Sequence, residues 1–325
     1  MEKITNLLVT GGRGYVGSNT INKLFYLYPN INWIVVGLTE ACEKKTINAD
    51  IVKSNRYKYY QCNIGNEKKM TKILCKYNIE YILDFAAFMP WVELLVSNNE
   101  FITNNITNKN IFFNTCIKYG KIKHIIHQGS VLATTTLKDS YDLTKNIYPK
   151  NTYNNLLYSM TKAGACSLAS NSLITSKLPI TIISPDHIYG GKNQHSEDFI
   201  VIYTKELCKT NKITLLKNAN TNYGSWIDVE DVVQAYQIIF SQGFNGKNYN
   251  LINSSQYYTE LELAQMIIFN IKNTINYSQY IKYDNSNYTF VPNIKDYNIQ
   301  TNFLPNQFKT SNTFTEEVKK LSKCY

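Results

Sequence analysis

A tyrosine and a lysine four residues apart, Tyr158 and Lys162, are the strongest candidates for catalysis in this chain of 325 residues. The run Asn151–Ala165 favours a helix, and residues i and i+4 share one helix face. An ammonium beside a phenol favours the phenolate, so we expect the Tyr158 pKa to fall below about 10. Such a tyrosine can exchange a proton with a carbinol or carbonyl oxygen while hydride passes to or from a nicotinamide, whose ribose the lysine can also bind. With 26 tyrosines in the chain, this spacing gains its weight only from its position after a fifth strand.

Three glycines near the N-terminus form the second chemical signal. They follow the apolar run Asn6–Thr10 and precede the helical pattern of Asn19–Tyr28. Glycine permits a tight turn in which backbone N–H groups approach a pyrophosphate at the positive end of a helix. The last glycine lets the helix pack closely on the strand. We therefore predict a dinucleotide site that includes Gly11, Gly14, Tyr15, Val16 and Gly17.

The end of the second strand bears on the choice of cofactor. NAD sites usually have an acid there that binds the ribose 2′-hydroxyl. Leu38 and Thr39 occupy that place, while Arg13 in the glycine turn could reach a 2′-phosphate. We favour NADP(H), with Arg13 and Thr39 in the site. An NAD(H) site in which Glu40 binds the ribose, and an Arg13 that is only solvated, are the alternatives.

The composition is that of a globular protein, with 44% apolar and 18% charged residues. There is no apolar run long enough for a membrane span and no signal-peptide pattern, so we expect no membrane association and a cytoplasmic location. The net charge of +10 suits a diphosphate substrate, and because the lysines are dispersed we expect no nucleic-acid partner. Seven scattered cysteines and four histidines lack metal-ligand spacing, which predicts reduced thiols and no metal site.

Apolar runs and helical patterns alternate through the first two-thirds of the chain. This order predicts an α/β fold with a doubly wound parallel sheet. We expect a Rossmann domain in residues 1–185 plus about 225–250, and a smaller C-terminal α/β substrate lobe in about 186–224 plus 251–325, where Thr259 caps a helix. The expected strands are Ile4–Thr10, Trp33–Leu38, Tyr57–Cys62, Glu80–Phe85, His124–Gln128 and Ile180–Ser184, and expected helices include Asn66–Tyr77 and Asn99–Tyr119.

Several ordered motifs together resemble the extended short-chain dehydrogenase/reductase family, the NAD-dependent epimerase/dehydratase-like enzymes of nucleotide sugars. Thr10–Gly17 is similar to its T-G-x-x-G-x-x-G, and the other matches extend over essentially the whole chain. These other family matches are Asn63-Ile64, Phe85-Ala86-Ala87, Asn104-Asn105-Ile106, Ile183–Gly190 and Trp226–Val232. Within the family, Gly129-Ser130 and the glycine loop Gly11–Ser18 are closest to those of GDP-fucose synthase-like 4-keto reductases.

The resemblance implies roles for further residues. Ser130, at the end of the fifth strand, would hydrogen-bond the reacting oxygen beside Tyr158, although a serine that only caps a loop is the alternative. Cofactor contacts would come from Asn63, Ile64, Ala86, Ala87, Asn105, Pro185 and Ile188, together with Tyr158 and Lys162. Substrate contacts would come from Phe88, His187, Lys192 and Lys217.

Departures from the family pattern narrow the implied reaction. The sugar 4,6-dehydratases of this family follow the Ser or Thr with Asp-Glu, whereas this chain has Val131-Leu132, which cannot move a proton. His187 replaces an Asn, and Gly224 an Arg, that hold the substrate diphosphate in the family. We therefore expect an NAD(P)H-dependent reductase of a nucleotide-linked 4-keto-6-deoxysugar. A nucleotide-sugar 4-epimerase with bound NAD and a non-enzymatic dinucleotide-binding sensor are the alternatives. The family also implies a homodimer, formed through Asn99–Tyr119 and Tyr153–Ser176.

Overall fold

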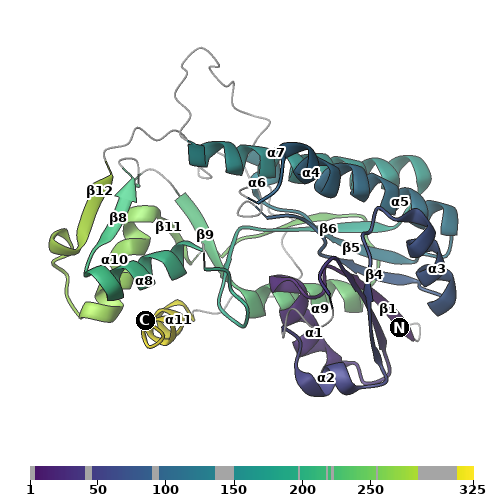
Figure 1. Cartoon of the computed structure of the whole chain (residues 1–325), viewed down its shortest axis with the longest axis horizontal. Coiled ribbons are helices and arrows are strands. Elements are labelled where there is room, and N and C mark those ends of the chain that lie inside the picture. The colour runs from purple at the N-terminus through teal and green to yellow at the C-terminus, as the bar shows by residue number, and fades with distance from the viewer. Residues whose placement is uncertain are drawn as a thin grey trace, which may run out of the picture.

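Seven parallel strands form the central sheet, in the order β10-β6-β5-β4-β1-β2-β3 (Figure 1). The computed structural model describes residues 4–40, 46–89, 95–135, 150–196, 198–216, 219–220, 223–253, 255–284 and 313–325. The predicted doubly wound parallel sheet is confirmed. Its strands are β1 (Asn6–Thr10), β2 (Asn32–Gly37), β3 (Tyr57–Gln61), β4 (Tyr81–Asp84), β5 (His124–Gln128), β6 (Ile180–Pro185) and β10 (Asn248–Leu251).

Helices cover both faces of this sheet because its strands are apolar on both sides (Figure 1). In β1, Leu7 and Val9 belong to one buried cluster and Leu8 to the other. The first cluster also contains side chains of α1 (Tyr15–Leu27) and α9 (Val229–Gln242), with α2 (Ala49–Lys53) at its edge. The second contains side chains of α3 (Glu67–Tyr77), α5 (Asn108–Tyr119) and α7 (Lys150–Ser176).

The helix expected over Asn99–Tyr119 is not continuous. It consists of α4 (Asn98–Ile102), a π-helical turn η2 (Thr103–Thr107) and α5. A π turn holds an extra residue and changes the direction of the side chains that follow it. Periodicity alone did not predict this turn, which places Asn105 and Lys109 against the loop after β4.

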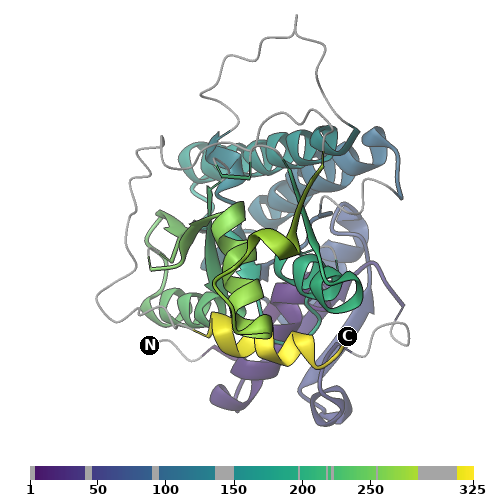
Figure 2. The same cartoon turned by 90° about the vertical axis from the view of Figure 1, so that its left-hand side faces the viewer.

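A smaller set of elements lies beyond the carboxyl ends of the central strands (Figure 1) and faces the viewer in Figure 2. It has its own buried cluster, which includes Tyr189, Trp226 and Phe314. The predicted cap at Thr259 is present as a capping box with Glu262. The elements are β7 (His187–Tyr189), β9 (Tyr223–Asp228) and β11 (Tyr257–Thr259) in one sheet, β8 (Ile213–Leu216) and β12 (Ile281–Asp284) in another, the helices α8 (Phe199–Thr210), α10 (Glu260–Lys272) and α11 (Phe314–Ser322), and the 3₁₀ turn η3 (Ser278–Tyr280).

Candidate active site

The glycine turn lies at the point where the strand order reverses, between β1 and β4. Gly11 has a φ of +63°, and a Cβ there would lie 2.7 Å from the backbone nitrogen of Ala86. A Cβ at Gly17 would lie 2.6 Å from the carbonyl oxygen of Gly11. Gly14 is the N-cap of α1, which begins with Tyr15 and Val16. The first N–H groups of α1 have no partner within the helix, so this turn fits a dinucleotide pyrophosphate.

The Arg13 side chain extends from the glycine turn to the residues that follow β2. It is 8% exposed, and its guanidinium donates to the carbonyl oxygen of Glu40 at 2.7 Å. The same group lies 4.6 Å from the centre of the Tyr59 ring, and the Tyr59 hydroxyl donates to the carbonyl oxygen of Thr39. Arg13 and Thr39 thus both contact Tyr59, and their part in a cofactor site stays a prediction.

Ser130 and Tyr158 meet at the carboxyl end of β5. Their side chains hydrogen-bond each other, and both residues are buried. Lys162 is also buried, and its Nζ donates to the carbonyl oxygen of Gln128 at 2.6 Å. The three predicted catalytic residues thus lie within one small region, where α7 contacts the end of β5.

The expected lowering of the Tyr158 pKa is wrong for this structure. Burial raises the Tyr158 pKa far above its ordinary value, and the Ser130 hydrogen bond offsets this only in part. The Lys162 ammonium bonds Gln128 rather than the phenol. Burial lowers the Lys162 pKa to about 8, because a charged ammonium is poorly solvated there. Tyr158 is therefore a protonated phenol at neutral pH.

The loop after β4 is fixed by a side chain of the π turn. The Asn105 amide accepts from the Phe88 nitrogen at 2.6 Å and donates to the Phe88 carbonyl oxygen at 3.0 Å. It also donates to the Thr161 hydroxyl at 3.1 Å, which joins the loop to α7 next to Lys162. Asn105 therefore positions the segment with Ala86, Ala87 and Phe88, a role that the sequence analysis did not assign.

Sequence reasoning missed a buried charged cluster beneath this loop. The carboxylate of Asp84 accepts from Thr10 Oγ1 at 2.5 Å, from Lys109 Nζ at 2.8 Å and from His127 Nδ1 at 2.7 Å. Burial would raise the Asp84 pKa, but Lys109 and His127 hold it well below its usual range. The sequence feature that could have indicated this cluster is Asp84 itself, a charged residue at the end of the otherwise apolar strand β4.

His187 lies on the side of the small sheets. Its ring stacks on Trp226 with centroids 4.5 Å apart and planes 18° apart, and Phe199 meets it edge-on. A Cβ at Gly224 would lie 2.6 Å from His187 Cδ2, so the glycine makes room for the imidazole. The two departures from the family pattern, His187 and Gly224, are thus in contact, and the small residue at one position makes space for the ring at the other.

Other predicted contacts are dispersed. Lys192 Nζ donates to Asn48 Oδ1 at 3.1 Å, so this side chain does not join His187. Asn63 accepts from the nitrogen of Gly65 at 2.8 Å. Lys217 lies outside the described residues. Of the rest, Ile64 and Pro185 are buried, Ile188 is partly buried, and Phe88 packs against Phe101.

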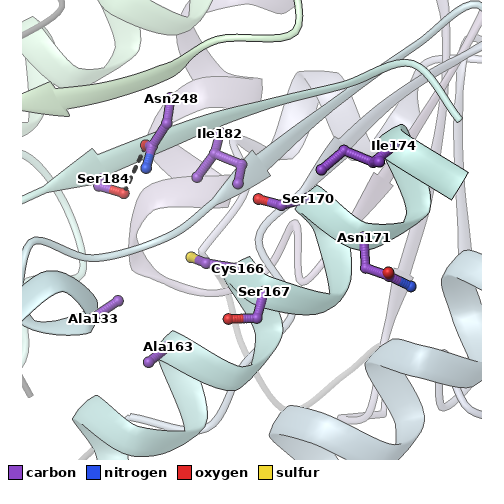
Figure 3. A pocket seen from close by; sticks show the side chains of 10 residues that line it. All are labelled: Ala133, Ala163, Cys166, Ser167, Ser170, Asn171, Ile174, Ile182, Ser184 and Asn248. Carbon is purple, nitrogen blue, oxygen red and sulfur yellow. Dashed lines mark hydrogen bonds between the residues drawn. The ribbon is translucent and has the colours of Figure 1, made fainter. Parts of the chain in front are cut away.

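A pocket of about 450 Å³ lies behind this region, between α7 and the strands β6 and β10 (Figure 3). Ser184 on β6 donates to Asn248 on β10, across from the α7 side chains (Figure 3). Burial raises the pKa of the Cys166 thiol in its wall. The described lining of the pocket does not include the three predicted catalytic residues Ser130, Tyr158 and Lys162. It consists of Ala133, Ala163, Cys166, Ser167, Ser170, Asn171, Ile174, Ile182, Ser184 and Asn248.

Two features are absent from the residues that the structure describes. No group of three or more His, Cys, Asp or Glu side chains in that part of the chain could hold a metal ion. None of the helices there has the length and apolar character that crossing a membrane requires.

Comparison with known proteins adds to this geometry. The family model described as "NAD dependent epimerase/dehydratase family" matches residues 7–253. The chain belongs to the NAD dependent epimerase/dehydratase family. This finding confirms the expected extended short-chain dehydrogenase/reductase membership.

Curated relatives from this family are distant and longer than the chain. A dTDP-D-glucose 4,6-dehydratase of Dictyostelium discoideum is 27% identical over 82% of this chain and 62% of its own length. A trifunctional UDP-glucose 4,6-dehydratase/UDP-4-keto-6-deoxy-D-glucose 3,5-epimerase/UDP-4-keto-L-rhamnose-reductase of Arabidopsis thaliana is 25% identical over 77% of this chain and 37% of its own length. The chain thus spans less than two-thirds of these relatives.

A solved structure shares the fold of this chain. The dTDP-glucose 4,6-dehydratase of Bacillus anthracis, in complex with NAD, has a TM-score of 0.71 and 20% identity, and the match covers 98% of this chain and 97% of that one. The doubly wound fold expected from the motifs is therefore shared with this solved structure.

Proposed function

We propose that this protein is an NAD(P)H-dependent reductase of a nucleotide-linked 4-keto-6-deoxysugar. The observation that carries the proposal is the hydrogen-bonded pair of Ser130 and Tyr158, together with the apolar residues Val131 and Leu132 that follow Ser130 in the chain. Elimination of water from the sugar needs an acid and a base, and neither of these apolar residues can transfer a proton. Reduction of a ketone needs only a positioned hydride donor and one acid.

The chain's own residues supply the acid. A nicotinamide dinucleotide, when bound, supplies the hydride, and the glycine turn and α1 fit its pyrophosphate. Tyr158 would donate its proton to the oxygen on C4, with Ser130 as a second hydrogen-bond donor to that oxygen. The buried phenol is protonated at neutral pH, which suits a proton donor. Lys162 would bind the ribose and would stabilise the tyrosinate left behind.

The NADP(H) preference remains part of the proposal. Arg13, fixed against Tyr59 and the Glu40 carbonyl, offers a planar cation where a 2′-phosphate would lie. The relatives and the solved structure above include an NAD complex, so NAD(H) is the competing cofactor.

We also propose that the small sheets with α8, α10 and α11 form the substrate lobe. His187, half-buried on Trp226, would be its substrate-facing group. The domain boundaries at about 185, 225 and 250 and a homodimer through α5 and α7 belong to the same proposal. Size-exclusion chromatography with light scattering tests the dimer.

The deciding experiment is NADPH oxidation against a panel of 4-keto nucleotide sugars made in situ. Tyr158→Phe should lower kcat/KM by about 10²–10⁴-fold, because the proton donor is lost. Tyr26→Phe, at an exposed tyrosine on α1, is the matched control and should leave the rate unchanged. Unchanged turnover in Tyr158→Phe would refute the assignment.

The epimerase alternative uses the same three residues and predicts a different result. An epimerase would retain NAD through purification and would interconvert two nucleotide sugars of equal mass without net NADPH consumption. Cofactor extraction and mass spectrometry of the products separate the two activities.

A further inference from the structure

Lys109 on α5 is a fully buried ammonium with every donor used. Its Nζ lies 2.8 Å from both carboxylate oxygens of Asp84 and 2.8 Å from the carbonyl oxygen of Ala86. Lysine and aspartate are 1% and 0% exposed. Both side chains lie between the sheet and the loop that packs on the glycine turn. This ion pair belongs to no part of the reaction described so far.

The pair is linked to Lys162 through two consecutive residues of β5: His127 bonds Asp84, and the next residue, Gln128, accepts the Lys162 hydrogen bond at its carbonyl oxygen. The ionisable groups whose charges act on Lys162 include Cys166 on the same helix, Lys109 on α5 and Asp84 on β4, and Lys162 in turn acts on His127. Asp84 is the one carboxylate of the described residues in this set. Burial lowers the His127 pKa to about 4, so this imidazole is neutral in the working range.

A buried ammonium bonds the nearest carboxylate that has an unused oxygen, since both charges lack water. Here Lys109 takes both oxygens of Asp84, and Thr10 and His127 take the remaining positions. Lys162 is left with a neutral partner, the carbonyl oxygen of Gln128. A carbonyl holds an ammonium less tightly than a carboxylate does.

We propose that Lys109 and Asp84 are positioning residues for Lys162: Lys109 occupies the Asp84 carboxylate and thereby keeps Lys162 available for the bound nicotinamide ribose and for Tyr158. This inference rests on the proposed function only in naming the nicotinamide ribose as the ligand of Lys162. The contacts of Lys109, Asp84 and Lys162 do not depend on that function.

A purely structural role does not account for the charges. Replacing a buried ion pair by apolar residues is often neutral or stabilising, so such a pair is weak evidence for stability. Asn105, four residues before Lys109, already ties the same loop to the helix through Phe88. The charge of Lys109 therefore calls for a role in the electrostatics of the site.

Opposite substitutions test the proposal. In Lys109→Met, Asp84 loses its partner and attracts Lys162, so the Lys162 pKa should rise by about one unit or more. In Asp84→Asn, the uncompensated Lys109 repels Lys162, so the Lys162 pKa should fall by a similar amount. Lys118→Met, at an exposed lysine of the same helix, is the matched control and should leave the Lys162 pKa unchanged.

The readout is the pH titration of the Lys162 ¹³Cε resonance in lysine-labelled protein, assigned by its loss in Lys162→Arg. This measurement needs no substrate, so it stands even if no 4-keto sugar is turned over. If turnover is found, the alkaline limb of kcat/KM should move in the same two directions, because the ammonium is needed. The neutral double variant Asp84→Asn/Lys109→Met gives the reference if either single variant fails to fold.

The proposal is supported if the Lys162 pKa rises in Lys109→Met and falls in Asp84→Asn. If only one of these single variants folds, its Lys162 pKa is compared with that of the double variant and should be higher for Lys109→Met or lower for Asp84→Asn. A Lys162 pKa that stays within about 0.3 units in all variants, or that moves the same way in both single variants, overturns it.

Discussion

Gly224 offers a sharp test of how the candidate substrate lobe is packed. Its three nearest contacts for an added Cβ all belong to His187, at 2.6, 3.0 and 3.8 Å. The backbone there is extended strand, which any residue adopts. Alanine at this position would therefore be favourable by about 0.4–1 kcal/mol if the imidazole were absent, since it restricts the unfolded chain.

With His187 present the sign should reverse. The methyl group forces the ring off Trp226, and overpacking of this kind costs about 1–3 kcal/mol, part of it from the lost ring stacking. We expect Gly224→Ala to destabilise the wild-type protein by about 1–2 kcal/mol and to stabilise His187→Ala by about 0.5 kcal/mol. The coupling energy of this double-mutant cycle is then about 2 kcal/mol.

Urea unfolding of the four proteins, with a shared m-value, measures the cycle. Trp226→Phe gives a further check, because it keeps a ring beneath His187 and should preserve the reversal. Equal effects of Gly224→Ala in the presence and absence of His187 would refute the packing argument.

Three further predictions concern charge. Burial lowers the folded-state pKa values of His124 and His127 to about 4, below the ordinary value of 6.5. The free energy of unfolding should therefore be highest above pH 6.5 and should fall as the pH drops toward 4, by up to about 3 kcal/mol per histidine. A urea midpoint that stays constant over this pH range would contradict this. Burial lowers the Lys162 pKa to about 8, so the buried ammonium is costly at pH 7, and Lys162→Met should raise the free energy of unfolding by about 1–3 kcal/mol while abolishing turnover. Thermal and urea unfolding measure this change, and a lower melting temperature would count against the prediction. Arg13→Ser should reduce kcat/KM for NADPH about 10–100-fold relative to NADH, as expected for the loss of a charge-assisted bond to phosphate, and an unchanged ratio would remove Arg13 from cofactor selection.

The sequence was sufficient for the features that depend on chain order. Parallel strands place their carboxyl ends at one edge, so Gly11, Ser130 and the helix with Tyr158 had to meet there. The N-cap of α10 at Thr259 was also predictable, because its side chain bonds the backbone three residues on.

Other features depend on three-dimensional packing that no local pattern records. Lys109 is a lysine in a helix, a residue type usually exposed, and its partner Asp84 precedes it by 25 residues. The Tyr158 pKa was predicted in the wrong direction because helix spacing gives proximity but not burial. His187 and Gly224 were noted separately, and only the contact between them explains why both depart from the family pattern.

The π turn at Thr103–Thr107 carries a consequence for how this gene can change. Because the turn holds one residue more than an α-helical turn, loss of one codon within it would restore an ordinary α-helix and leave the later side chains of α5 in nearly their present directions. Gain of one codon there would instead rotate those side chains by about 100°, which would move Lys109 away from Asp84 and take Phe112 and Phe113 out of the core. Deletions and insertions at this point of the helix should therefore have unequal effects.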